Sequence, residues 1–154
     1  RSINLDLVDA ELSGLVEYVA QVLRPVADTK RITLVEDAPV CDFKVDTERI
    51  TQVLVNLIGN AIKYSPADST VTISGNVKEN EIEVTIADQG PGLTLEQQKL
   101  IFEPFKRTST SAGEKGTGLG LAISKHLVEL HGGKIGVRCP HEGGSIFWFS
   151  IPKS

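Results

Sequence analysis

Three glycines, Gly116, Gly118 and Gly120, alternate with other residues directly before an apolar segment that is typical of a helix. Because glycine has no Cβ, the backbone of such a run can approach a ligand closely. The following helix would turn its unpaired N–H groups and the positive end of its dipole toward that ligand. The pattern indicates a phosphate site, while a turn without a ligand is an equally good interpretation of the glycines alone.

A second set of polar residues lies on a predicted helix over residues 47–64. Asn56, Asn60 and Lys63 follow one another at spacings of four and three, so they share one face beside an apolar stripe. Amide oxygens can ligate a hard cation such as Mg2+ without cancelling its charge, and a lysine can act as a point charge beside phosphate. Asparagine is a poor helix former, which makes this row unusual, although a solvated polar face remains the alternative.

The segment Asp88–Gly92, with the sequence Asp-Gln-Gly-Pro-Gly, directly follows a strand pattern over residues 81–87. A carboxylate at a strand end, followed by two glycines, offers a hydrogen-bond acceptor where a flat ligand can lie over the backbone. An adenine amino group is a natural donor to Asp88. A simple β-turn also suits this composition, and it is the favoured interpretation when the segment is taken alone.

Hydrophobic periodicity predicts the elements that must position these residues. Asp46 is the expected N-cap of the helix that carries the amide row. Helices over one face of a single sheet would give a two-layer α/β sandwich, with residues 1–154 forming one domain. The predicted helices cover residues 8–28, 47–64, 95–101 and 119–130, and the predicted strands cover 31–36, 70–77, 81–87, 134–138 and 145–151.

Composition excludes several other classes of protein. The chain has a net charge of −4, whereas a nucleic-acid-binding protein usually carries a basic surface. No apolar run is long enough for direct membrane insertion. Cys41 and Cys139 lie far apart without metal-ligand spacing, which favours free thiols in a cytoplasmic setting, with one disulfide left open. Because the chain begins at Arg1, we expect a fragment of a longer protein, whose membrane anchoring stays open.

Taken together, four segments resemble the motifs of the GHKL ATP-binding superfamily. Asn56–Tyr64 resembles its N box, Asp88–Gly92 its first glycine box, Ile101–Phe105 its F box and Gly116–Leu121 its second glycine box. In their order and their residues, the four motifs are similar to those of the catalytic and ATP-binding domain of sensor histidine kinases, and the resemblance covers about residues 5–152. The resemblance implies a Bergerat-type ATP-binding fold, with a mixed sheet covered on one face by helices, and the cofactors ATP and Mg2+.

The resemblance also implies a role for each matching position. Asn60 would ligate Mg2+ through its side-chain oxygen, and Asn56, one turn earlier, would support the phosphates and the metal. Asp88 would accept a hydrogen bond from the adenine amino group, and residues 106–115 would form the ATP lid. The implied nucleotide-binding residues are Asn56, Asn60, Lys63, Tyr64, Asp88, Gly90, Gly92, Phe105, Gly116, Thr117, Gly118, Leu119, Gly120 and Leu121.

Three residues are predicted to be catalytic: Asn56, Lys63 and Arg107, the last of which falls where many family members place an arginine near the γ-phosphate. Related ATPases of the gyrase type carry a glutamate at the position of Asn56, and that carboxylate deprotonates water. An amide cannot act as a general base. A neutral histidine nucleophile needs less help, since the pKa of histidine is about 6.5. Asn56 therefore favours phosphoryl transfer to histidine.

The phosphoacceptor histidine is expected outside this chain, because His126, His131 and His141 all lack the sequence context of an acceptor. His131 falls at a predicted helix end, where a cation would suit the dipole. The resemblance implies a helical dimerisation domain that carries the acceptor, joined through residues 1–6, and a response regulator as the final partner. The alternative is a nucleotide-sensing module that relays its state to a partner without transferring phosphate.

Overall fold

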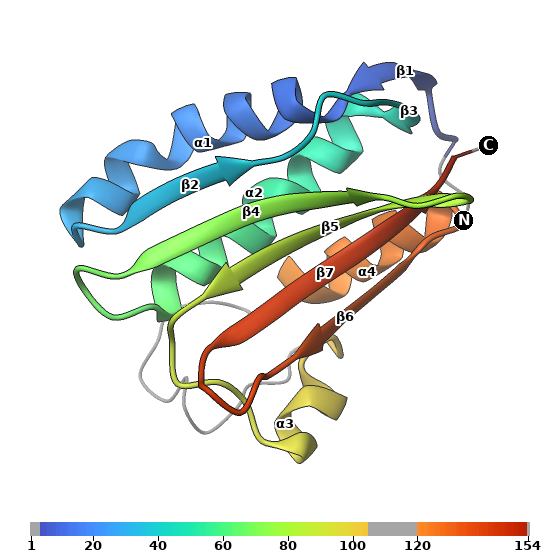
Figure 1. Ribbon diagram of the computed structural model, residues 1–154. Coiled ribbons are helices and arrows are strands. Elements are labelled where there is room, and N and C mark those ends of the chain that lie inside the picture. The colour runs from blue at the N-terminus through green and yellow to red at the C-terminus, as the bar shows by residue number, and fades with distance from the viewer. Residues whose placement is uncertain (1–3, 105–119, 154) are drawn as a thin grey trace.

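In the computed structural model, which describes residues 4–104 and 120–153, strands of alternating apolar and polar residues form a five-stranded mixed sheet (Figure 1). Only the first two strands in the sheet order are parallel, and every other neighbouring pair is antiparallel. In that order the strands are β2 (Thr33–Asp37), β4 (Thr70–Val77), β5 (Glu81–Asp88), β7 (Ser145–Pro152) and β6 (Lys134–Arg138).

Three helices cover one face of this sheet: α1 (Leu12–Thr29), α2 (Thr47–Tyr64) and α4 (Gly120–Leu130) (Figure 1). A shorter helix, α3 (Leu95–Leu100), lies beside β6. The core fills the space between the two layers, and side chains such as Ile73, Val84 and Phe149 are fully buried there. This arrangement confirms the predicted two-layer α/β fold, with a mixed sheet covered on one face.

The central helix α2 begins and ends at the predicted residues. Its N-cap Asp46 accepts a hydrogen bond from the backbone of Arg49 at 3.3 Å, and the chain turns away at Ser65, just before a proline. The apolar stripe of α2, which includes Leu54 and Leu57, is fully buried. Each such side chain contributes about 1.5–3 kcal/mol to folding, so burial fixes the direction of the polar row beside the stripe.

A second, two-stranded sheet is a feature that the sequence analysis missed. β1 (Leu7–Glu11) pairs antiparallel with β3 (Asp42–Asp46), so the first helix starts at Leu12, and the predicted range 8–28 was wrong at its beginning. The side chain of Glu11 accepts hydrogen bonds from two amides of the first helical turn and caps it. Pairing with a distant strand therefore overrides the helical periodicity of this segment.

Several of the remaining boundaries differ from the predictions by one or two residues, while those of β4 and β6 match. β2 begins at Thr33, because the preceding Arg31 takes a positive φ of 57° in the turn after α1. The predicted helix start at Leu119 lies outside the described residues, as does the beginning of the predicted connector, residues 1–6. At the end of that connector, the backbone of Asp6 donates to an Asp46 carboxylate oxygen at 2.9 Å. Among the described residues, no helix is long and apolar enough to cross a membrane.

Candidate nucleotide-binding site

The carboxylate of Asp88, the predicted adenine acceptor, lies half-buried at the end of β5. Its Oδ1 accepts hydrogen bonds from the backbone amides of Gly90 at 2.9 Å and Ser145 at 3.2 Å. Among the described residues both of these bonds fall on the same oxygen, Oδ1, so they orient the carboxylate. Burial raises the pKa of the Asp88 carboxyl above its ordinary value, against a smaller lowering by the two amide bonds.

The glycines around Asp88 are required by contacts within the protein itself. A Cβ on Gly90 would lie 2.8 Å from the carbonyl oxygen of Tyr64, the last residue of α2. Gly92 takes a positive φ of 79°, and a Cβ there would lie 3.2 Å from the carbonyl oxygen of Gly144. A Cβ on Gly144 would in turn lie 2.2 Å from the carbonyl oxygen of Asp88. The Asp88 loop is therefore clamped between the end of α2 and the β6–β7 hairpin.

Two further side chains hold this loop, and the sequence analysis gave neither of them this role. The Gln89 side chain accepts a hydrogen bond from the backbone amide of Thr70 at 2.7 Å, which ties the loop to the start of β4. The Cys139 thiol accepts one from the amide of Leu93 at 3.3 Å and lies 3.7 Å from the hydroxyl oxygen of Ser145. Residues 41 and 139 both hold free thiols, as expected from the sequence. No local pattern would have assigned Cys139 to this loop.

The polar row of α2 lies next to the first turn of α4. Asn56 and Asn60 are half-buried, and the Asn56 amide nitrogen Nδ2 donates to the carbonyl oxygen of Gly120 at 3.2 Å and to the Ser124 hydroxyl at 3.1 Å. The Lys63 ammonium, also on this face, lies 5.3 Å from the centre of the Tyr64 ring. The helix thus brings together the predicted metal ligand, a cation and the start of α4.

The far end of α4 is also attached to α2, through His131. The imidazole Nε2 accepts a hydrogen bond from the backbone amide of Asp46 at 3.0 Å, and Nδ1 faces the carbonyl oxygen of Leu127 at 2.8 Å. An amide can only donate, so Nε2 carries no proton and Nδ1 holds it. His131 therefore links the far end of α4 to Asp46, the N-cap residue of α2.

Several predicted site residues lie outside the described residues, and their roles stay predictions. Gly120 and Leu121 are described, and both are half-buried in the first turn of α4. Among the described residues, the atoms nearest to a Cβ on Gly120 belong to the Asn56 side chain, at 3.8 Å or more, which is ordinary contact. Those outside the described range are Phe105, Arg107, Gly116, Thr117, Gly118, Leu119 and the ATP lid, residues 106–115.

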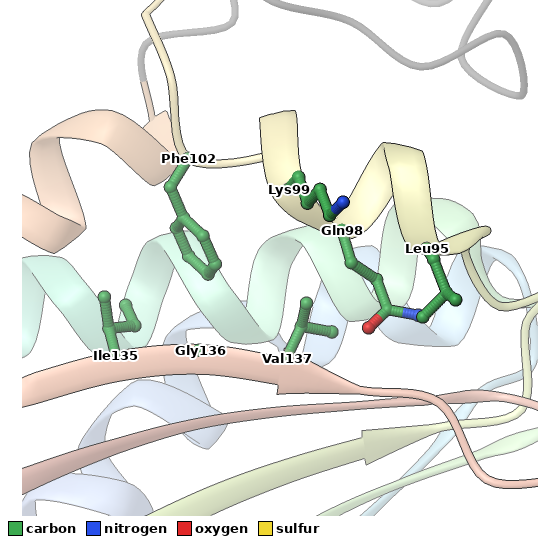
Figure 2. Close-up of a pocket in the computed structure, with 7 residues that line it drawn as sticks. All are labelled: Leu95, Gln98, Lys99, Phe102, Ile135, Gly136 and Val137. Carbon is green, nitrogen blue, oxygen red and sulfur yellow. The ribbon is translucent and has the colours of Figure 1, made fainter.

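A separate hollow of about 350 Å³ lies between α3 and β6 (Figure 2). Figure 2 shows Phe102, which belongs to the predicted F box, pointing from the segment after α3 toward β6. Its ring packs edge-on against that of the core residue Phe147, with the ring centres 6.2 Å apart. Apart from Gly136, the hollow is lined by Leu95, Gln98, Lys99, Phe102, Ile135 and Val137, none of which is a predicted nucleotide-binding residue.

The donor chemistry of the site fits a magnesium ion that is shared with a ligand. Within residues 4–104 and 120–153, no group of three or more His, Cys, Asp or Glu side chains could hold a metal ion by itself. Asn60 instead offers a half-buried amide oxygen, with Lys63 one turn further along α2. Mg2+ is commonly held by few protein oxygens together with substrate phosphates, so this sparse set is compatible with such a shared ion.

Comparison with known proteins identifies the family. The family model described as histidine kinase-, DNA gyrase B-, and HSP90-like ATPase matches residues 45–154. The adaptive-response sensory kinase SasA of a Synechococcus strain is 35% identical over 148 residues, which are 94% of this chain and 39% of the relative. The sensor-like histidine kinase SenX3 of Mycolicibacterium smegmatis is also 35% identical, over 97% of this chain and 39% of its own length.

Solved structures show the same similarity. Full-length ShkA in complex with AMPPNP superposes with a TM-score of 0.89 and 32% identity, covering 99% of this chain and 32% of that chain. The nucleotide-free catalytic domain of the histidine kinase ThkA gives a TM-score of 0.87 and 30% identity, covering 97% of both chains. The present chain thus spans the length of an isolated catalytic domain but 39% of the curated relatives above. It belongs to the family of histidine kinase-, DNA gyrase B- and HSP90-like ATPases, as a histidine kinase ATPase domain of the GHKL type.

Proposed function

We propose that this domain binds Mg-ATP and transfers the γ-phosphoryl group to a histidine on a dimerisation domain outside the chain. One observation carries the proposal: the loop of Asp88 packs directly on the last turn of α2, the helix that carries Asn60 and Lys63. An oriented carboxylate for the adenine ring and an amide and a cation for phosphates therefore lie at adjoining positions. ATP as the phosphoryl donor implies a cytoplasmic site of action.

Each end of the nucleotide would meet a different kind of group. The Asp88 carboxylate would accept a hydrogen bond from the adenine amino group, which distinguishes adenine from guanine. Asn60 would hold Mg2+, with Lys63 beside the phosphates, Tyr64 along the ribose and the N–H groups of the first turn of α4 nearby. When bound, Mg2+ neutralises charge that develops on the transferring phosphoryl group, so the protein mainly positions the reactants.

The environment of Asn56 supports transfer to histidine over hydrolysis. Its Nδ2 is bonded to Gly120 and Ser124, so the position holds a donor where related ATPases hold a carboxylate base. In the proposed step an imidazole nitrogen attacks the γ-phosphorus, the bond to the β–γ bridging oxygen breaks, and ADP leaves. The solved complex of ThkA with the response regulator protein TrrA, whose kinase is 28% identical to this chain, supports a response regulator as the final acceptor.

Calorimetric titration of the domain with ATP and GTP, with and without Mg2+, is the first test. We expect selective and Mg2+-assisted binding of ATP, together with negligible hydrolysis by the domain alone. Addition of the dimerisation domain of the parent protein should then yield phosphohistidine on that domain. Rapid hydrolysis without an acceptor would contradict the kinase assignment, and absence of any nucleotide binding would favour the non-catalytic sensing module.

A further inference from the structure

The side chain of Asn56 offers both a donor group and an acceptor group to the nucleotide site, and the structure shows how the donor is used. We propose that Asn56 is a positioning residue: its amide N–H groups fix the first turn of α4 to α2, and the metal is ligated by Asn60 and not by Asn56. This inference rests on the proposed function, because it takes the nucleotide phosphates to lie between Asn60 and the start of α4.

The hydrogen bonds of Asn56 connect it to two successive turns of α4. Its Nδ2 lies 3.2 Å from the carbonyl oxygen of Gly120 and 3.1 Å from the hydroxyl oxygen of Ser124, four residues further along. An amide nitrogen carries two hydrogens, so α4 can engage both of them. The Ser124 side chain belongs to a fully buried residue, which water does not reach. The hydrogen bond from Asn56 therefore gives the Ser124 hydroxyl a polar partner that water could not supply.

The position of this bond determines where α4 starts relative to the metal site. Asn60 follows Asn56 by one turn of α2, a rise of about 6 Å along the helix axis. The Gly120 carbonyl that Asn56 holds belongs to the first described residue of α4, so the bond holds the described beginning of that helix. Because His131 fastens the other end of α4 to the start of α2, the two links together set the direction of α4.

An aspartate substitution separates the two possible roles of this side chain. Asn56→Asp retains the size and the oxygen of the amide and adds charge, so a metal ligand at this position would be kept or strengthened. It removes both N–H groups, and it places a carboxylate against the Gly120 carbonyl oxygen. Asn60→Asp is the matched control, since it makes the same change on the same helix face one turn away.

The experiment compares the wild type with Asn56→Asp, Asn60→Asp and Ser124→Ala, the last of which removes one acceptor of the Asn56 amide. Calorimetry gives the Kd of ATP in Mg2+ and in EDTA and the Kd of adenosine, and thermal unfolding without nucleotide gives Tm. For Asn56→Asp we expect Tm to fall by about 3 °C or more and ATP to bind about tenfold more weakly. The ratio of the two ATP dissociation constants, and the Kd of adenosine, should match the wild type.

The controls make the outcome decisive. Asn60→Asp should change the ratio of the ATP dissociation constants in Mg2+ and EDTA while leaving Tm near that of the wild type. Ser124→Ala should lower Tm and ATP affinity in the same direction as Asn56→Asp and leave the ratio unchanged, which tests the contact even where the aspartate variant does not fold.

An altered Mg2+ ratio in Asn56→Asp or Ser124→Ala, or an unchanged Tm in both, would overturn the inference. Failure of the wild type to bind Mg-ATP would instead overturn the proposed function, and the Tm values would then decide whether the α2–α4 contact exists.

Discussion

The two ends of the candidate nucleotide site are held in different ways. At the proposed adenine end, the Asp88 loop meets neighbouring backbone at Gly90 and Gly144, where the packing leaves no room for a Cβ. At the proposed phosphate end, α4 is attached to α2 through polar side-chain contacts at Asn56 and His131. A hydrogen bond contributes about 0.5–1.5 kcal/mol to stability. A clash between a new Cβ and backbone cannot be relieved without moving the backbone itself, because the interior is closely packed.

The difference indicates that one site can combine a part of fixed geometry, held by backbone packing, with a part whose position can shift, held by a few hydrogen bonds. Adenine is the same in every nucleotide state, so a recognition loop fixed by the backbone suits it. The phosphates change during the reaction, and a helix held by a few hydrogen bonds can shift at modest cost. The variants below test the contrast, beginning with the largest expected effect.

Gly144→Ala should be the most disruptive substitution at the adenine end. The new Cβ would lie 2.2 Å from the carbonyl oxygen of Asp88, at a residue whose φ is +80°. We expect a loss of about 3 kcal/mol or more in the free energy of unfolding, measured by urea denaturation. Gly143→Ala is the control, since Gly143 also has a positive φ but nothing within 4 Å of its Cβ. Equal losses in both variants would show that backbone conformation, and not the contact with Asp88, is responsible.

Asp88→Asn should lower ATP affinity by about tenfold or more while it raises the stability of the nucleotide-free domain at pH 7. The amide can still accept the two backbone hydrogen bonds, but it removes the cost of burying a charge. Because burial raises the pKa of the Asp88 carboxyl, its protonation stabilises the fold below the ordinary pKa of about 3.9, and this contribution is lost as pH rises through the raised value.

Thermal unfolding of both proteins between pH 4 and pH 8 checks this expectation. The Tm advantage of Asp88→Asn should shrink as pH falls and the wild-type carboxyl becomes neutral. A Tm difference that is the same at every pH would contradict the role assigned to burial. ATP binding by the wild type should also weaken as pH falls, because the Asp88 carboxyl becomes protonated. Since its pKa is raised, this weakening should begin at a higher pH than for an aspartate with an ordinary pKa.

His131→Phe should have a smaller effect, at the phosphate end. The substitution leaves the backbone amide of Asp46 without its imidazole acceptor, which we expect to cost about 1–2 kcal/mol of stability, measured by urea denaturation. His126→Phe on the same helix is a suitable control, because His126 is exposed. If the two variants unfold alike, the link between α4 and the start of α2 contributes nothing measurable.

Elements with strong local patterns could be predicted from the sequence. α2 and the strands Thr70–Val77 and Lys134–Arg138 begin and end where periodicity and capping place them. β1 and β3 were missed, because their pairing joins Leu7 to Asp46 and no local signal records that contact. The helical spacing of apolar residues after residue 8 was real, but it extended the predicted helix into a segment that pairs as a strand.

In the candidate site, too, residues with a local sequence signal could be predicted, whereas residues placed by long-range strand pairing could not. Asp88, Asn60 and Lys63 could be predicted as site residues because their residue types and spacing suit a nucleotide and its metal ion, and their roles stay predictions. Ser145 and Cys139 were not identified as supports of Asp88, because their position depends on the pairing of β5 with β7. Their amide and thiol groups become relevant only after that register is known.

The same register has a consequence for chain entropy. Asp88 and Ser145 are direct partners at the ends of β5 and β7, and all of α3, residues 105–119, α4 and β6 lie between them in sequence. The entropic cost of closing such an excursion grows with the logarithm of its length, so that doubling it costs only about 0.6 kcal/mol. A single hydrogen bond at the base of the excursion contributes about as much. The carboxylate of Asp88, the proposed adenine acceptor, therefore stands at the point where this long excursion of the chain is fastened.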